Sequence, residues 1–151
     1  MPVKRLSLRG CLIIGLLISA GFAAWSWFRP YAWNVDPNAL CEVVGCQVRQ
    51  DRTNFWVDAH LQMKPGKVHD LMKPVRLVTA AGREIEPADT TLAGAVGQEP
   101  RELWFKFWLE SEDMQGPLEL RINGGSLVVK AGSGMPNLGA SRLEYFVTNR
   151  W

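Results

Sequence analysis

The chain has 151 residues, of which 47% are apolar and 21% charged, and its formal net charge at pH 7 is +2. That length suits one domain with its own core, and no internal period indicates a repeat protein. The positive charge does not indicate a nucleic-acid-binding protein, because the first 29 residues hold four of the seventeen Lys and Arg and none of the fifteen Asp and Glu. The rest of the chain has a net charge of −2 and no basic cluster, so it lacks the electrostatic footprint that phosphate backbones require.

The first predicted element is an apolar helix. The uncharged stretch GCLIIGLLISAGFAAWSWF is long enough as a helix to cross a hydrocarbon layer of about 30 Å. We expect a transmembrane helix over residues 11–28, after a basic N-terminus over residues 1–10. Because Lys4, Arg5 and Arg9 precede the apolar stretch, the positive-inside rule predicts a single-pass inner or plasma membrane protein with a cytoplasmic N-terminus. Its C-terminal domain is then extracytoplasmic, in a periplasm-type compartment.

A cleaved signal peptide is the alternative, because GFAA within this stretch offers small residues at a cleavage site. We favour an uncleaved anchor, since aromatic residues crowd the end of the apolar stretch in the manner of an interfacial belt. These residues are Trp25, Trp27, Phe28, Tyr31 and Trp33. Residues 29–39 contain two prolines and two asparagines and show no periodicity, which predicts a short linker. The folded domain is expected over residues 40–151.

Two cysteines lie at the start of this domain. Cys41 and Cys46 are an even pair in a compartment that favours disulfides, because Cys11 belongs to the apolar helix. We therefore expect a Cys41–Cys46 disulfide, with the intervening EVVG forming a turn that Gly45 permits. The alternative is that both thiols are free and hold a metal.

From residue 40 onward, apolar residues alternate with period two between turn signals. Strands are predicted in TNFWVDAHLQM (residues 53–63) and ELWFKFWLE (102–110), and hairpins in PVRLVTAAGREIEP (74–87) and LELRINGGSLVVK (118–130). The last hairpin turns at Asn123-Gly124-Gly125, which supply the positive φ angles of a tight turn. About seven strands with almost no helix predict an all-β domain, an immunoglobulin-like β-sandwich. A small, partly closed β-barrel is the alternative.

The strand over residues 102–110 is aromatic on both faces. Leu103, Phe105, Phe107 and Leu109 share one face, and Trp104, Lys106 and Trp108 share the other. The second face could be covered within the chain by the Gly-rich segment 131–141 or by Trp151. If it is uncovered, Trp104, Lys106 and Trp108 form an interface for a partner protein, a glycan or a membrane surface.

Both histidines lie in HLQMKPGKVHDLM (residues 60–72), each three residues before a methionine. Imidazole with thioether or thiolate ligands suits copper, so a copper-type site of His60, His69, Met72 and the cysteines is the alternative function. The strand pattern argues against it, because residues three apart in a strand point to opposite faces.

No catalytic signature is present. The chain has no G-x-S-x-G, and the acidic pair Glu84 and Glu86 beside a turn is typical of a solvated face. We therefore expect no catalytic residues and no cofactor. The predicted function is that of a membrane-anchored accessory module that contacts a protein partner.

Overall fold

The computed structural model describes residues 8–151, so Lys4, Arg5 and most of the predicted N-terminal segment 1–10 lie outside the described residues. The chain divides into two compact units, Met1–Tyr31 and Ala32–Trp151. The first contains helix α1, Leu8–Trp27, which is long and apolar enough to cross a membrane. None of its described side chains is buried.

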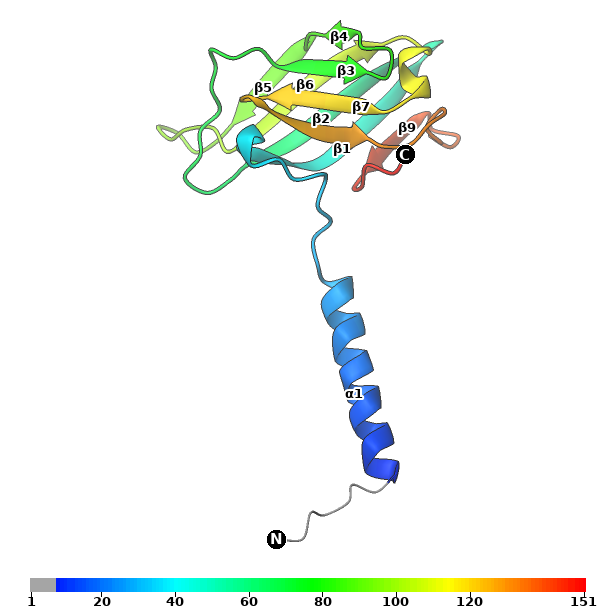
Figure 1. The fold of residues 1–151 in the computed structure, drawn as a ribbon. Coiled ribbons are helices and arrows are strands. Elements are labelled where there is room, and N and C mark those ends of the chain that lie inside the picture. The colour runs from blue at the N-terminus through cyan, green and yellow to red at the C-terminus, as the bar shows by residue number, and fades with distance from the viewer. Residues whose placement is uncertain (1–7) are drawn as a thin grey trace. The chain divides into compact units, whose positions relative to one another are not determined.

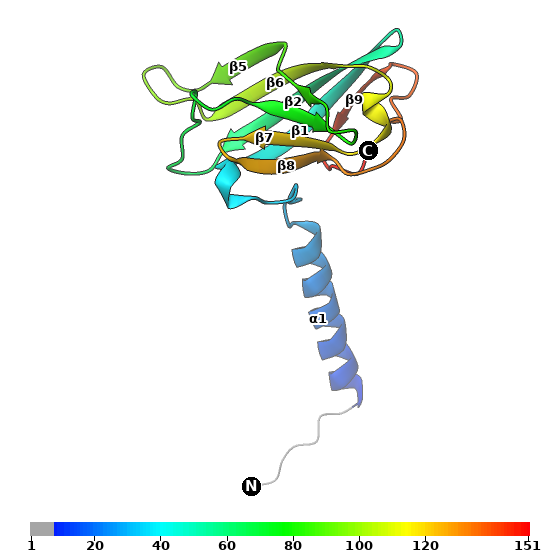
Figure 2. The same ribbon diagram turned by 45° about the horizontal axis from the view of Figure 1, so that its top comes forward.

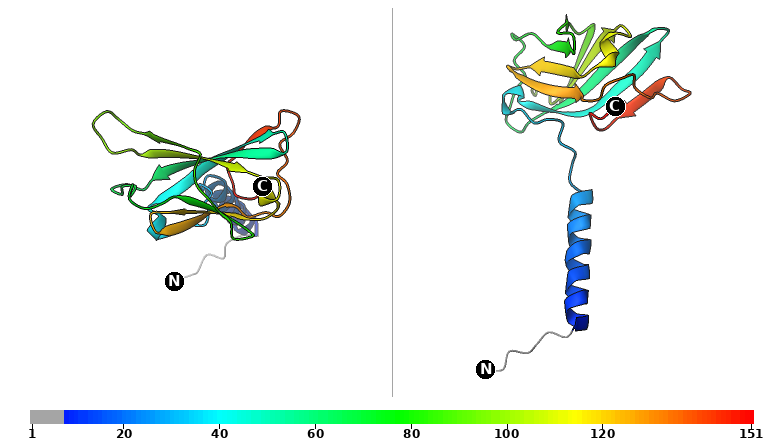
Figure 3. Two further views of the ribbon diagram at one scale, coloured as in Figure 1. Left: turned by 90° about the horizontal axis from the view of Figure 1, so that it is seen from above. Right: turned by 45° about the vertical axis from the view of Figure 1, so that its right-hand side comes forward.

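The second unit is an antiparallel β-sandwich, and Figure 1 shows its two sheets one behind the other. The five-stranded sheet has the order β5 (Asp89–Ala93), β6 (Glu102–Leu109), β2 (Asn54–Met63), β1 (Cys41–Asp51), β9 (Leu143–Phe146). The four-stranded sheet has the order β4 (Glu84–Ile85), β3 (Arg76–Thr79), β7 (Leu118–Ile122), β8 (Gly125–Lys130). Short 3₁₀ helices occupy Pro37–Ala39 (η1) and Asp113–Gln115 (η2). Figure 2 and Figure 3 show the two layers from other directions, and neither sheet closes into a barrel.

The two long alternating strands form the centre of the five-stranded sheet. β2 pairs with β6 so that Val57 lies opposite Phe107, and Leu61 opposite Leu103. The inward residues of both strands are almost completely buried against the four-stranded sheet, as the period-two pattern predicted. The predicted β-sandwich is therefore confirmed.

The hairpin between β7 and β8 turns where the sequence predicted. Ile122 pairs with Gly125, and the two residues between them, Asn123 and Gly124, have φ angles of 56° and 96°. Two positive φ angles in a two-residue loop match the twist of the flanking strands.

The N-terminal part of the domain differs from the prediction. β1 is an eleven-residue strand that contains both cysteines, so EVVG is not a turn. Cys41 and Cys46 are free, buried thiols. Five residues of extended chain separate them by about 16 Å, whereas a disulfide needs Cα atoms within about 7 Å, so the predicted disulfide is wrong. Burial raises the pKa of the Cys41 thiol to about 12 and that of Cys46 still further from its ordinary value.

The folded domain also begins earlier than residue 40. Trp33 is buried in the core instead of joining an aromatic belt, and the second unit starts at Ala32. Asp36 accepts hydrogen bonds from the backbone N–H groups of Ser126 and Asn38, both at 2.9 Å, and these bonds lower its pKa. Most of the predicted linker is thus part of the sandwich.

The C-terminal residues pack on the core beside β8. The Trp151 ring stacks on Phe146, with ring centroids 4.9 Å apart, and lies 5.9 Å from the buried Lys130 ammonium. Lys130 Nζ donates to the carbonyl oxygens of Gly116 (3.1 Å) and Gly132 (2.6 Å), and burial lowers its pKa. Trp151 therefore packs near β8, against Phe146 and Lys130, and does not cover the outer face of β6.

Candidate functional site: the outer face of the five-stranded sheet

The outward side chains of the five-stranded sheet form a continuous surface that we call the aromatic face. Strand pairing aligns its residues in three rows across β5, β6, β2, β1 and β9. The face consists of Gln47, Arg49, Trp56, Asp58, His60, Asp89, Thr91, Trp104, Lys106, Trp108 and Tyr145. It includes all three residues of the predicted interface, Trp104, Lys106 and Trp108, on the outer side of β6.

One row contains two tryptophans. Trp56 of β2 lies directly opposite Trp108 of β6, with ring centroids 4.6 Å apart and an interplanar angle of 61°. This edge-to-face geometry is favourable between aromatic rings and limits the freedom of both side chains. Each tryptophan is nevertheless only partly buried. The chain therefore holds two large rings in place at its surface and leaves part of each ring exposed.

The next row is charged. Lys106 of β6 lies between Asp58 of β2 and Asp89 of β5, and its Nζ is 3.8 Å from Asp58 Oδ2. The other carboxylate oxygen, Asp58 Oδ1, is buried and accepts no hydrogen bond from any described residue. Burial raises the pKa of Asp58, and the nearby Lys106 opposes the shift only partly. Asp58 Oδ1 is thus a buried acceptor without a hydrogen bond from the described part of the protein, just beneath the surface of the face.

The third row is a stacked pair. The His60 ring lies parallel to Trp104, with centroids 3.7 Å apart and an interplanar angle of 6°. His60 Nε2 is 3.5 Å from Glu102 Oε2, the outer limit for a hydrogen bond, and that buried nitrogen has no closer partner in the described chain. The stack leaves the His60 side chain 14% exposed.

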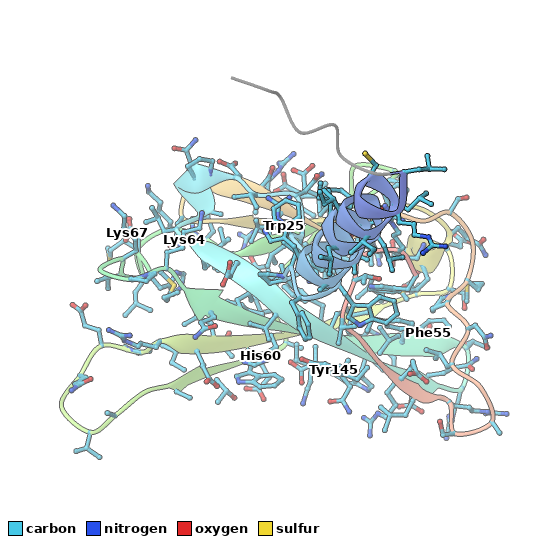
Figure 4. The ribbon with its side chains drawn as sticks, turned by 90° about the horizontal axis from the view of Figure 1, so that it is seen from below. Trp25, Phe55, His60, Lys64, Lys67 and Tyr145 are labelled. Carbon is cyan, nitrogen blue, oxygen red and sulfur yellow. The ribbon has the colours of Figure 1, made fainter. Side chains whose placement is uncertain are left out.

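Gly45 of β1 extends this row beyond His60, which it opposes in the pairing of β1 with β2. A β-bulge at Val43 to Gly45 shifts the register, and a Cβ atom at Gly45 would lie 2.0 Å from the Tyr145 hydroxyl oxygen. The glycine was predicted to allow a turn, but its role is to admit the Tyr145 ring from β9. Figure 4 shows His60 and Tyr145 on the side of this sheet that faces away from the four-stranded sheet.

Two shallow depressions, each of about 200 Å³, flank the Asp58–Lys106 pair. One is lined by Asp58, Asp89, Thr91, Trp104 and Lys106, so its two carboxylates outnumber its one cation. The other is lined by Gln47, Arg49, Trp56, Asp58, Lys106 and Leu143, so its two cations outnumber its one carboxylate. The face thus has an excess of negative charge on one side of the Asp58–Lys106 pair and an excess of positive charge on the other. A tryptophan ring lines each depression, Trp104 in the first and Trp56 in the second.

The residues of the predicted metal site are not brought together. His60 belongs to the aromatic face, whereas His69 lies in the β2–β3 loop with its Nδ1 2.8 Å from Asn123 Oδ1. The Met72 side chain is 92% exposed, and the cysteines point into the core. No cluster of three or more His, Cys, Asp or Glu residues with metal-binding geometry is found among residues 8–151.

Period-two alternation places Trp56, Asp58 and His60 on one face of β2, but the sequence assigned His60 only to the alternative copper-type site and gave Trp56 and Asp58 no role. The sequence did not predict that β2 pairs with β6. That pairing places His60 opposite Trp104 and Trp56 opposite Trp108. Asp89 was missed because the five residues of β5 carry no strong strand pattern.

Comparison with known proteins adds no family to this description. No protein-family model, curated protein or solved structure matches the chain.

Proposed function

We propose that this chain is a non-catalytic, membrane-anchored accessory protein whose β-sandwich binds a partner protein through the aromatic face. The observation that carries the proposal is the pair of tryptophans, Trp56 and Trp108, fixed edge to face on an open sheet surface. Tryptophan is enriched among the residues that dominate binding energy, and a rigid ring loses little entropy when a partner covers it. The charged depressions beside the rings supply the polar complement that fixes a partner's orientation.

The anchor in this proposal is α1, with the N-terminus in the cytoplasm and the sandwich in the periplasm. The support for this orientation is the charge bias of the sequence, because Lys4, Arg5 and Arg9 precede the uncharged apolar stretch. A reporter enzyme fused after Trp151 should be active only outside the cytoplasm. Activity in the cytoplasm would overturn the orientation.

A catalytic role is not proposed, because the aromatic face offers no nucleophile positioned by a base. Its histidine, His60, is stacked on Trp104 and faces Glu102, and its depressions are shallow. Shallow, partly polar surfaces beside exposed rings are typical of protein contact sites, whereas active sites are concave and largely enclosed.

Site-specific photocrosslinking in intact cells tests the contact. A photoreactive phenylalanine in place of Trp108 should form a discrete adduct, and the adduct should weaken when Trp56→Ala is added. The matched control is the same photoreactive residue at Val128, a partly buried position on the outer face of the four-stranded sheet. Equal adducts from both positions, or adducts unaffected by Trp56→Ala, would contradict the proposal.

A further inference from the structure

The most exposed apolar side chains of the β-sandwich lie in two of its loops. Val96 is fully exposed, Met72 is 92% exposed and Leu71 is 72% exposed. Leu71 and Met72 belong to the loop between β2 and β3, and Val96 belongs to the loop between β5 and β6. Large side chains of this kind are seldom left in water without a function when they gather in one region.

Both loops lie at the same end of the sandwich. β2 ends where β6 begins, since the Met63 N–H donates to the Arg101 carbonyl oxygen at 2.8 Å. Together the loops enclose a depression of about 300 Å³, which is lined by Met63, Lys64, Gly66, Lys67, Gln98, Glu99, Pro100 and Arg101. The exposed apolar residues therefore belong to one loop-bearing end of the domain, away from the centre of the aromatic face.

The two loops carry more bases than acids. They contain Lys64, Lys67, Lys73 and Arg101, against Asp70 and Glu99, although Asp36 lies near Lys64 and Glu102 follows Arg101 at the start of β6. Lys73 pairs with Asp70 at 3.8 Å, but Lys64 and Lys67 form no ion pair within residues 8–151. Figure 4 shows these two lysines near each other at one end of the sandwich. Free lysines beside exposed apolar side chains match a surface of anionic headgroups over a hydrocarbon layer.

Strand β1 also begins at this end. The Lys64 N–H donates to the Leu40 carbonyl oxygen at 3.0 Å, which joins the start of the β2–β3 loop to the residue that precedes β1. Asn123 ties the rest of the loop to the same place. Its Nδ2 donates to the Ala39 carbonyl oxygen (2.6 Å), its Oδ1 accepts from the Asp70 N–H (2.9 Å), and its carbonyl oxygen accepts from Lys73 Nζ (3.1 Å).

Only residues 28–32 separate the end of α1 from Trp33, the first core residue of the sandwich. Five residues of fully extended chain span at most about 18 Å. A tether of this length raises the effective concentration of the domain's surface at the bilayer that the helix crosses.

From these observations we infer that the β2–β3 and β5–β6 loops form a second membrane contact, in which Leu71, Met72 and Val96 enter an anionic lipid surface and Lys64 and Lys67 meet its headgroups. The contact would hold these two loops at the bilayer surface. The inference rests on the anchoring role proposed for α1, but it does not depend on a protein partner.

The test uses the full chain with Cys11→Ser in lipid nanodiscs. An environment-sensitive fluorophore is attached at Met72→Cys, and in a matched variant at Val147→Cys, an equally apolar position that is 62% exposed and outside both loops. In discs that contain phosphatidylglycerol, spin-labelled lipid should quench the probe at 72 but not the probe at 147. Adding Lys64→Gln and Lys67→Gln should lower the docked population about tenfold or more, because each lysine near an anionic surface contributes appreciably.

Equal quenching of the two probes by spin-labelled lipid, or quenching at 72 that is unchanged by the two lysine substitutions, would overturn the inference. Alkaline washing of membranes that contain the same chain separates this result from failure of the anchor. A chain that is retained while the probe at 72 stays in water contradicts the loop contact alone. A chain that is released contradicts the anchoring role of α1.

Discussion

The two outer faces of the sandwich are built from the same alternation of residues but differ in chemistry. The outer face of the four-stranded sheet carries ion pairs such as Arg121 with Glu84 (2.7 Å) and Arg76 with Glu86 (2.7 Å), and no aromatic residue occurs in β3, β4, β7 or β8. Such a surface satisfies its own charges and stays in water. The aromatic face instead keeps tryptophan rings partly exposed and leaves Asp58 Oδ1 without a hydrogen bond. The proposed contact therefore uses the aromatic face and not the outer face of the four-stranded sheet.

The largest effect is expected from the core that both faces share. Phe105→Ala should lower the free energy of unfolding by about 3–5 kcal/mol, because Phe105 is almost completely buried and its loss leaves a cavity. Trp104→Ala, one position away on the opposite side of β6, should cost only about 1 kcal/mol for the lost stack on His60. Denaturant unfolding of the full chain measures both values. Equal losses would mean that Trp104 belongs to the core and that the aromatic face is not a separate surface.

A smaller but more selective effect is expected on binding. Trp108→Ala should weaken partner binding by about 2 kcal/mol, close to thirtyfold, because it removes a fixed ring from the proposed contact. Arg121→Ala on the four-stranded sheet should leave binding within about 0.5 kcal/mol of the original value. Titration with the partner identified by crosslinking gives both numbers. A larger loss from Arg121→Ala than from Trp108→Ala would reverse the assignment of the two faces.

The pH dependence of stability tests the burial of Asp58 on the aromatic face. The pKa of folded Asp58 lies above its ordinary value of 3.8, so the folded chain holds that proton more tightly than the unfolded chain does. The stabilisation that this proton contributes is present at low pH and is lost as the pH rises from 3.8 through the raised pKa of folded Asp58. The free energy of unfolding, measured relative to Asp58→Asn, should therefore fall over that window.

Asp36 provides a control of opposite sign. Its pKa is lowered by two backbone hydrogen bonds, so its contribution is present above 3.8 and is lost as the pH falls through the lowered value. Stability relative to Asp36→Asn should thus fall toward acid pH. The same sign for both residues would contradict the burial of Asp58 described above.

The smallest effect is expected on the four-stranded sheet. Arg121 and Glu84 are each about half exposed, with side-chain accessibilities of 52% and 49%, so water screens their attraction. A double-mutant cycle with Arg121→Ala and Glu84→Ala should give a coupling of about 0.2–1 kcal/mol. A coupling well above this range would show that this face is more than a solvated surface.

Much of this comparison could be predicted from the sequence, because period-two alternation fixes which residues share a face. The inward residues of β2 and β6, and the tight turn at Asn123 and Gly124, were placed correctly. Alternation says nothing about which strands pair, so the stack of His60 on Trp104 and the edge-to-face contact of Trp56 with Trp108 were not foreseen.

The errors have physical causes of the same kind. An even pair of cysteines in an oxidising compartment favoured a disulfide, but the β-bulge in β1 lets Cys41 and Cys46 both face the core without a turn between them. Gly45 was interpreted as a turn residue, since the approach of Tyr145 from a strand one hundred residues away leaves no local signal. Trp33 resembled a membrane-interface residue because burial in a distant core cannot be distinguished locally from burial in lipid.

Hydroxyl-radical footprinting of the full chain in its native membranes and after purification tests the central claim most directly. If the aromatic face is a contact surface, Trp56, Trp104 and Trp108 should be oxidised several-fold more slowly in native membranes than in the purified chain. Val78 and Val128, on the outer face of the four-stranded sheet, should react equally in the two samples. Protection of the two valines with no change at the tryptophans would contradict the account.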